Sequence, residues 1–405
     1  MLSVDAALAR IVARHAPLPA ETVSIADADG RVLAAAITAR LDQPFADLSA
    51  MDGYAVRAAD CTTLPKTLKV VGQAPAGGAY AGVLGAGETV RIFTGGPLPA
   101  GADTIVIQEN TKVEATGTVT IVEGVQPGRH IRRRGLDFAA GATGLEPGRR
   151  LGPRDIALAA AMNVPWLSVH RRPRVAILAT GDELVMPGEP IGPNQILSSS
   201  ALAVAALVRA WGGEPTLLGI AHDTRDDIGA RINAGLSAEL LVTLGGASVG
   251  DHDLVQDVLK TQGFTLDFWR IAMRPGKPLM FAERGPQTAL GLPGNPVSTM
   301  VCALLFLKPA LERLSGLPGH PVATRPAVLG VDVGANDNRQ DYVRSRLQYR
   351  GGEPPIVTPF TVQDSSMLSF LARADGLMVR PAHDPARAAG GTVEVIDFTS
   401  LGSAF

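Results

Sequence analysis

Carboxylates follow two short apolar segments in the centre of the chain. Asp182 and Glu183 follow segment 175–180 after one glycine, and Asp223 comes after segment 216–220. Carboxylate oxygens suit Mg²⁺, which usually takes one or two of them together with substrate phosphate. These acids therefore predict a magnesium site that faces a phosphate group.

Glycine loops and basic residues follow the next segments. Segment 240–244 leads into Gly245-Gly-Ala-Ser248-Val-Gly250, with Asp253 just beyond, and two later loops read Arg274-Pro-Gly-Lys277-Pro278 and Leu292-Pro-Gly-Asn295-Pro-Val-Ser298. Glycine lets backbone N–H groups approach an anion, and a helix N-terminus favours negative charge. The pattern indicates a phosphate-bearing ligand bound with a divalent cation.

An alternation of strands and helices must position these residues. It favours a doubly wound, mainly parallel sheet, in which ligands bind beyond the carboxyl ends of the strands. The predicted strands are 175–180, 216–220, 240–244, 264–271, 278–282 and 288–292, and the predicted helices are 199–211, 225–234, 253–261 and 297–307.

The flanking regions have a different pattern. Ser3 can cap a helix whose apolar positions run from Val4 to Val12, and Pro153 suits the first turn of a helix over 153–162. Short β-type segments separated by Gly and Pro predict a β-rich domain within 44–138 and a small β domain after Pro321. Their strands are expected at 67–71, 89–93, 104–108, 119–122, 327–333, 342–348, 376–380 and 392–397.

Composition limits the classes of function. The chain has 405 residues, so two to three domains are expected, and its 37 basic and 39 acidic residues do not suggest a nucleic-acid or membrane-surface partner. Cys61 and Cys302 form no CxxC pair, so a disulfide scaffold or a thiolate zinc site is not expected. No signal-peptide pattern opens the chain, and the apolar run 297–307 is too short to cross a bilayer. A cytoplasmic protein is the expectation.

Each motif also has a structural interpretation. Asp223 and Asp253 could cap helices, the glycine loops could be plain turns, and the basic run 129–134 could be a solvated surface. The motif around Ser248 fits GxSxG of a serine hydrolase, but such an enzyme would need His320 or His383 downstream, and both stand in weak contexts. Lys277 is not part of a P-loop, because Pro278 stands where Ser or Thr is required.

Longer segments of the chain resemble the molybdopterin molybdenumtransferase family (MoeA and the E domain of gephyrin). The matching segments occur in the order of the family across nearly the whole chain, and their combination is specific. They are FADLSAMDGYA (45–55), RIFTGGPLPAGAD (91–103), IRRRG (131–135), TGDEL (180–184), GGASVG (245–250), PGKP (275–278) and GLPGNPVS (291–298).

The resemblance implies an α/β multidomain protein. Its central doubly wound sheet would be like that of molybdopterin adenylyltransferase, with a β-rich second domain and a C-terminal β-barrel. The implied domains are a segmented linker domain (1–44 and 140–170), the second domain (45–139), the central molybdopterin-binding domain (171–318) and the barrel (319–405).

The family reaction inserts molybdenum from molybdate into adenylylated molybdopterin, with Mg²⁺, and releases AMP. The resemblance further implies a homodimer with active clefts shared between subunits, and transfer of the product to molybdoenzymes or their chaperones. We therefore expect the Asp223→Ala and Lys277→Ala variants to fold but to lose molybdenum insertion.

The resemblance also assigns roles to individual residues. The implied catalytic residues are Asp52, Thr94, Asp137, Glu183, Asp223 and Asp253, of which Asp223, Asp253 and Glu183 would hold Mg²⁺. The implied molybdate pocket consists of Arg274, Lys277, Pro278, Ser298, Arg344 and Ser365. The loops for molybdopterin and AMP contain Gly245, Gly246, Ser248, Gly250, Pro293, Gly294, Asn295 and Pro296.

Three positions depart from the family pattern. Arg274 stands where Lys is usual, Gly96 replaces Ala, and the 195–200 stretch lacks the Asp and Asn commonly found there. Other interpretations stay open: an adenylyltransferase or a nucleotide pyrophosphate hydrolase of the same central fold, or a non-catalytic scaffold. The β-rich second domain and the C-terminal domain argue against the small adenylyltransferase, and the retained charged residues argue against a scaffold.

Overall fold

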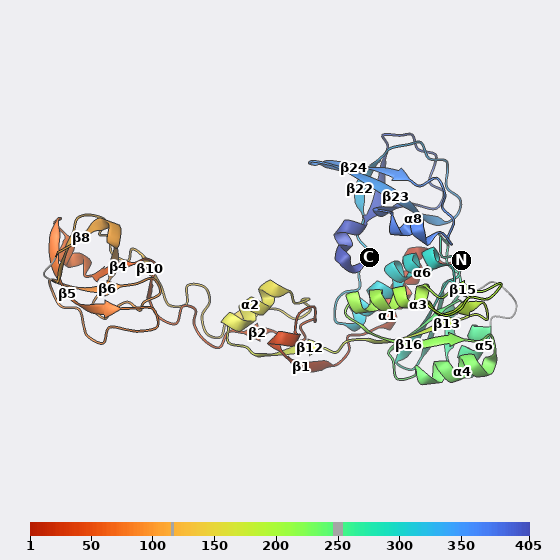
Figure 1. The fold of residues 1–405 in the computed structure, drawn as a ribbon, viewed down its shortest axis with the longest axis horizontal. Helices are drawn as coiled ribbons and strands as arrows, with labels where there is room; N and C mark the ends of the chain where they lie inside the picture. Colours follow the sequence, from red (N-terminus) through yellow and green to blue (C-terminus); the bar gives the residue numbers. More distant parts are fainter. Residues whose placement is uncertain (115–116, 246–253) are drawn as a thin grey trace. The chain divides into compact units, whose positions relative to one another are not determined.

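The structure is a computed structural model that describes residues 1–114, 117–245 and 254–405. The chain forms two compact units, which are described separately below (Figure 1). The larger unit comprises Met1–Glu21, Gly30–Ala34 and Val169–Phe405, and the smaller unit comprises Thr22–Asp29 and Ala35–Ser168. The chain passes between the units four times: within strands β1 (Ala20–Ser24) and β12 (Trp166–His170), between Asp29 and Gly30, and between Ala34 and Ala35.

A six-stranded sheet forms the centre of the larger unit. Its strand order is β16-β13-β17-β21-β20-β18. The first four strands are parallel; β20 pairs antiparallel with β21, and β18 pairs antiparallel with β20 at the edge of the sheet. This arrangement confirms the mainly parallel sheet, although the strand expected over 264–271 is shorter. The strands are β13 (Arg174–Thr180), β16 (Glu214–Ala221), β17 (Leu240–Leu244), β18 (Thr265–Phe268), β20 (Met280–Arg284) and β21 (Gln287–Leu292).

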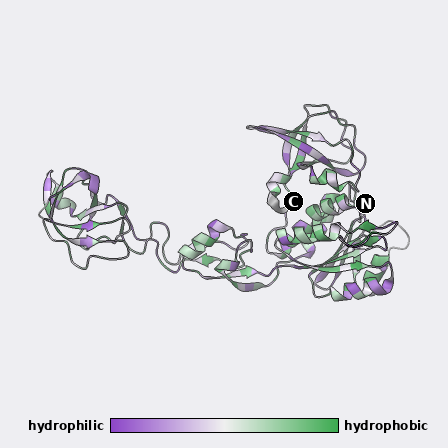
Figure 2. Ribbon diagram, in the orientation of Figure 1, coloured by the Kyte–Doolittle hydropathy of each residue, from purple (hydrophilic) through white to green (hydrophobic). Residues whose placement is uncertain are grey.

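Helices cover both faces of this sheet. Successive strand residues point to opposite sides, so both faces carry apolar side chains that the helices bury. Val175 and Ile177 pack in one core with α1, α3, α6 and α7, while Ala176 and Leu178 pack on the other side with α4 and α5. Figure 2 shows hydrophobic residues along the central strands and hydrophilic residues on α4 and α5. The helices are α1 (Val4–Arg14), α3 (Ser200–Ala210), α4 (Arg225–Ala234), α5 (Leu254–Thr261), α6 (Pro296–Cys302) and α7 (Lys308–Leu314).

The start of α1 follows the sequence prediction, and one helix runs longer than predicted. Ser3 caps α1 by accepting a hydrogen bond from the Ala6 amide at 3.2 Å. The helix expected over 297–307 continues through a π-helical turn, Ala303–Leu307, into α7. The wider turn lies directly before the turn containing Pro309, whose nitrogen cannot donate to the helical ladder. Among the described residues, no helix is long and apolar enough to cross a membrane.

The C-terminal part of the larger unit is a closed five-stranded barrel. Its order is β23-β24-β22-β26-β25, and β25 pairs again with β23. A short strand from the central region, β19 (Met273–Arg274), joins the barrel by pairing parallel with β23. The barrel strands are β22 (Arg325–Leu329), β23 (Gln340–Arg350), β24 (Glu353–Pro359), β25 (Gly376–Arg380) and β26 (Thr392–Asp397). The remaining short elements of the larger unit are β14 (Leu184–Val185), β15 (Ile196–Leu197) and α8 (Leu368–Ala372).

The smaller unit is β-rich, as predicted. Its main sheet has the order β7-β4-β6-β5-β9-β8, and two short strand pairs, β2 with β11 and β3 with β10, accompany it. Helix α2 (Pro153–Ala161) begins at Pro153, as expected. The strands are β2 (Ile37–Thr38), β3 (Leu48–Ser49), β4 (Gly53–Val56), β5 (Lys66–Ala74), β6 (Glu88–Ile92), β7 (Thr104–Ile107), β8 (Thr111–Val113), β9 (Thr118–Ile121), β10 (Ile131–Arg132) and β11 (Thr143–Leu145).

Candidate functional site

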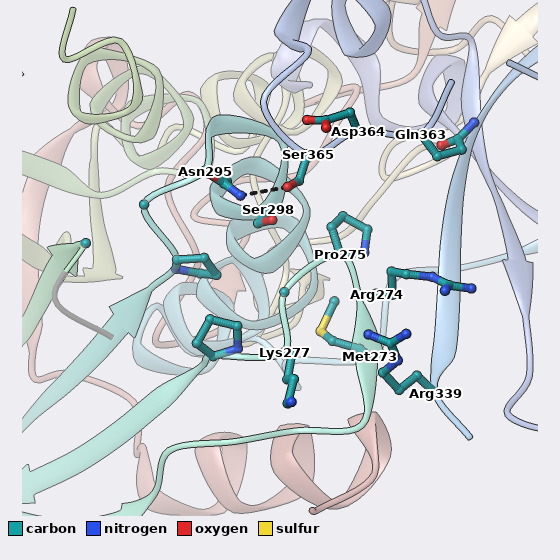
Figure 3. A pocket seen from close by; sticks show the side chains of 15 residues that line it. Met273, Arg274, Pro275, Lys277, Asn295, Ser298, Arg339, Gln363, Asp364 and Ser365 are labelled. Carbon is teal, nitrogen blue, oxygen red and sulfur yellow. Dashed lines mark hydrogen bonds between the residues drawn. The ribbon is translucent and has the colours of Figure 1, made fainter. Parts of the chain in front are cut away.

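A cavity of about 610 Å³ lies where the ends of the central strands meet the barrel (Figure 3). We call it the oxyanion cavity, because basic and hydroxyl side chains line it. It brings together nine of the residues singled out from the sequence: Gly245, Arg274, Lys277, Pro278, Pro293, Gly294, Asn295, Ser298 and Ser365. It also contains lining residues that the sequence analysis missed, among them Arg339, Gln363 and Asp364.

The loop after β19 carries the basic residues into the cavity. Pairing of Arg274 with Asp341 across β19 and β23 fixes the start of this loop against the barrel. Gly276 then adopts a φ of +115°, and a Cβ at this position would lie 2.5 Å from the buried Cys302 Sγ. A glycine is therefore required for the turn that presents Lys277.

Ser298 lies on the first turn of α6 and is 4% exposed. The turn is held against a barrel loop, because Asn295 Nδ2 donates to Ser365 Oγ at 2.7 Å and the Val297 amide donates to the Ser365 carbonyl at 3.1 Å. Figure 3 shows the Asn295–Ser365 bond above Ser298. The central domain and the barrel thus share one wall of the cavity.

The three basic side chains of the cavity differ in their partners, and Arg339 pairs with Asp337 at 2.6 Å. Arg274 binds Asp341 and also reaches Asp337 at 3.4 Å and Asn336 Oδ1 at 3.2 Å. In Figure 3 its side chain extends away from Ser298. Lys277 is exposed, and within the described ranges it forms no ion pair. Lys277 is therefore the cavity cation whose charge is least compensated.

Arg344, another predicted molybdate residue, lies behind the wall of the cavity. It is 2% exposed, and its Nη1 donates to the Met367 carbonyl at 3.0 Å while Nε donates to Gln363 Oε1 at 3.3 Å. Burial lowers the pKa of its guanidinium. Arg344 thus supports Gln363, which does line the cavity, and its direct contact with an oxyanion stays a prediction.

A second cavity of about 420 Å³ adjoins the first. The two cavities share Gly245, Gly294 and Asn295 as lining residues, so they meet at the carboxyl ends of β17 and β21. The second cavity also includes Pro296 and Glu183 of the predicted site. Its other walls are partly apolar and partly hydroxyl-bearing: Leu184, Ile196, Leu197 and Leu244 on one hand, and Thr180, Ser198, Ser199, Ser200 and Ser366 on the other.

Acidic residues gather at the ends of β13 and β16, and we call Asp182, Glu183 and Asp223 the acidic rim. The Asp223 amide and His222 Nδ1 both bond Asp182 Oδ1 at 3.1 Å. Partial burial, together with the charges of Asp182 and Glu183, raises the pKa of Asp223. The same amide and His222 lower the pKa of Asp182. Asp182 is one of the acids that predict a magnesium site from the sequence, although the resemblance assigns it no role.

The helix-cap interpretation of Asp223 is wrong. Thr224 is the N-cap of α4, and its hydroxyl accepts from the Asp227 amide at 3.3 Å. The Asp223 carboxylate is therefore not used in capping, and it lies close enough to Asp182 and Glu183 to feel their charges.

Four predicted residues, Gly246, Ser248, Gly250 and Asp253, lie outside the described residues. Their roles, including Asp253 as a magnesium ligand and Ser248 in a GxSxG motif, stay predictions. Within 1–114, 117–245 and 254–405, no group of three or more His, Cys, Asp or Glu side chains is arranged to hold a metal ion. The described carboxylates of the acidic rim therefore do not by themselves form a complete set of metal ligands.

The smaller unit brings two of its three predicted residues together. Asp52 Oδ1 accepts from the Thr94 amide at 2.7 Å and from the Thr94 hydroxyl at 2.8 Å, and these bonds lower the pKa of Asp52. Asp137 is exposed, and its amide donates to the Gln43 carbonyl at 2.9 Å. The basic run 129–134 is partly neutralised by surface ion pairs, since Arg133 pairs with Asp47 and Arg134 with Asp42.

Comparison with known families covers most of the chain. Residues 2–163 match the MoeA N-terminal region (domain I and II). Residues 176–313 match a probable molybdopterin binding domain, and residues 326–398 match the MoeA C-terminal region (domain IV).

Individual relatives agree with these matches. The chain is 36% identical to a molybdopterin molybdenumtransferase of Nostoc sp., over 93% of this chain and 88% of the relative. It is 32% identical to the molybdopterin molybdenumtransferase of Haemophilus influenzae, over 99% and 100% of the two chains. A crystal structure of the molybdopterin biosynthesis MoeA protein from Pyrococcus horikoshii superposes with a TM-score of 0.84, at 29% identity and 98% and 99% coverage. The chain belongs to the molybdopterin molybdenumtransferase (MoeA) family of molybdenum cofactor biosynthesis.

Proposed function

We propose that this protein inserts molybdenum from molybdate into adenylylated molybdopterin and releases AMP. One observation carries the proposal: the oxyanion cavity and the cavity that contains Glu183 share lining residues at the carboxyl edge of the sheet. An oxyanion and a phosphate-bearing substrate bound in adjoining cavities would be held at reacting distance. The names and coverage of the relatives support the same reaction.

The oxyanion cavity suits a tetrahedral dianion. Charge-assisted hydrogen bonds from ammonium and guanidinium groups to an oxyanion are short and strong. Lys277 supplies a point charge, and Ser298 supplies a hydroxyl on the first turn of α6, where the helix dipole favours negative charge. We propose that molybdate binds between these two residues.

The acidic rim suits a magnesium ion that faces phosphate. The raised pKa of Asp223 reflects neighbouring carboxylates whose charges a cation would offset. Asp223 and Glu183 would hold Mg²⁺, and Asp253 would complete the set. When bound, the ion would neutralise the phosphates during loss of AMP.

The smaller unit would act on the cleft of a second copy. The Asp52–Thr94 pair presents a fixed carboxylate and a hydroxyl, with Asp137 on the same unit. We propose that these residues face the cleft of the partner in a homodimer. Mixing inactive Lys277→Ala and Asp52→Asn chains would then restore one intact cleft in each mixed dimer, or about a quarter of wild-type activity after random exchange. No recovery, with exchange verified, would contradict the shared cleft.

The reaction is tested by following AMP release from two substrate mixtures. With preformed adenylylated molybdopterin, we expect AMP release that rises with molybdate concentration and saturates. With ATP and molybdopterin, we expect no adenylylation above background. ATP-dependent adenylylation would indicate an adenylyltransferase, molybdate-independent AMP release would indicate a hydrolase, and no AMP in any mixture would indicate a scaffold.

A further inference from the structure

We propose that Arg339 is a further binding residue of the oxyanion cavity and that Asp337 is its internal counter-ion. The proposal rests on the proposed molybdate-binding function and extends it to a barrel loop that the sequence motifs did not identify. Arg339 lines the cavity beside Met273 and Arg274, and its side chain is 27% exposed (Figure 3). It follows Asp337 on the loop that leads into β23.

The loop holds the Arg339 guanidinium in a fixed place. Its Nη2 donates to Asp337 Oδ2 at 2.6 Å and its Nε donates to Asp337 Oδ1 at 3.3 Å. Asn336 anchors the loop, because its Nδ2 donates to the carbonyls of Arg339 and Pro381, each at 2.8 Å. A guanidinium carries five N–H donors, so its pairing with Asp337 leaves donors for an oxyanion.

The neighbouring arginine is less available to a ligand. Arg274 is held by Asp341, Asn336 and Asp337, all on the barrel side of the cavity. Arg339 has Asp337 as its ion-pair partner within the described chain. A planar guanidinium fork also matches two oxygens of an oxyanion, which the Lys277 ammonium does not. Arg339 is therefore the better placed of the two arginines to bind the oxyanion.

The Asp337 carboxylate would repel an oxyanion bound to Arg339. This carboxylate contacts both arginines of the cavity wall, at 2.6 Å and 3.4 Å, and the Asp337 side chain is 42% exposed. A dianion bound to Arg339 would lie within a few ångströms of this negative charge, where repulsion is only partly screened. Replacing Arg339 and replacing Asp337 should thus change oxyanion affinity in opposite directions.

The test is calorimetric titration of the full chain with sodium molybdate. We expect Arg339→Gln to weaken binding by about tenfold, as for loss of a charge-assisted contact. We expect Asp337→Asn to tighten it by about threefold. The surface pair Arg10 and Asp267, 2.7 Å apart in the same unit and outside the cavity, provides matched charge controls. Arg10→Gln and Asp267→Asn should bind molybdate within about twofold of wild type.

Three results would overturn the proposal. Wild-type affinity in Arg339→Gln would exclude Arg339 as a ligand. Equal weakening in Arg339→Gln and Asp337→Asn would show that the pair merely maintains the loop. Unchanged affinity in Asp337→Asn would exclude the counter-ion role. Failure of the wild-type protein itself to bind molybdate would instead overturn the proposed function, and circular dichroism melting curves identify any variant that fails to fold.

Discussion

The oxyanion cavity and the acidic rim lie at the same edge of one sheet but differ in how their charges are balanced. In the cavity, Asp337 and Asp341 already compensate Arg274 and Arg339. At the rim, Asp182, Glu183 and Asp223 lie close to one another, and their mutual repulsion contributes to the raised pKa of Asp223. The cavity arginines are thus already paired with carboxylates, whereas among the described residues no Lys or Arg forms an ion pair with the rim carboxylates. This difference predicts that the two regions respond differently to substitution, magnesium and pH.

The largest loss of activity is expected from the Lys277→Ala variant. This variant removes the cavity cation with the least compensation, so molybdate-dependent AMP release should fall by about 100-fold. Steady-state assays at several molybdate concentrations measure the change, and Arg10→Gln serves as a control for loss of one positive charge. Activity within twofold of wild type would remove Lys277 from the site.

A smaller loss of molybdate-dependent AMP release, about 30-fold under limiting magnesium, is expected from Asp223→Asn. Added magnesium should recover part of the loss, because a weakened site fills at higher concentration. Asp182→Asn should lose less, since its carboxylate is already bonded to His222 and to the Asp223 amide. If Asp182→Asn were the more damaging change, or if magnesium recovered neither variant, the roles assigned to the rim would be wrong.

The dependence of molybdate affinity on salt concentration tests the role of Lys277 in the oxyanion cavity. Molybdate binding to the exposed Lys277 should weaken by about threefold between 0.05 M and 0.3 M NaCl, because screening shortens the reach of exposed charges. The Lys277→Ala variant should show little of this dependence. A salt response unchanged by the substitution would mean that other charges attract the oxyanion.

The smallest effect is on the stability of the protein without ligands. The pKa of Asp223 is raised, so the folded state holds its proton more tightly than the unfolded state does. The ionised carboxylate therefore destabilises the fold at pH 7, and this cost disappears as the pH falls below the ordinary Asp range. We expect Asp223→Asn to raise the melting temperature of the larger unit by about 1 °C at pH 7, with no gain near pH 3.5. A lower melting temperature at pH 7 would show that the carboxylate stabilises the fold.

Strand ends and loop motifs were predictable from the sequence, because the carboxyl ends of parallel strands must meet at one edge. This reasoning predicts that Glu183, Asp223 and Lys277 lie at the same edge of the sheet. It could not find Arg339, which lies 65 positions beyond Arg274 and reaches the cavity through the pairing of β19 with β23. Nor could it show that Thr224, and not Asp223, caps α4, since both residue types are good caps.

The central claim is that an oxometallate binds in the oxyanion cavity beside the acidic rim. Anomalous X-ray scattering from a crystal soaked in tungstate, the heavier tetrahedral analogue of molybdate, tests this claim most directly. We predict a tungsten peak inside the cavity with oxygens about 3 Å from Lys277 Nζ, Ser298 Oγ and the Arg339 guanidinium. A fully occupied tungsten site elsewhere on the protein, with this cavity empty, would contradict the account.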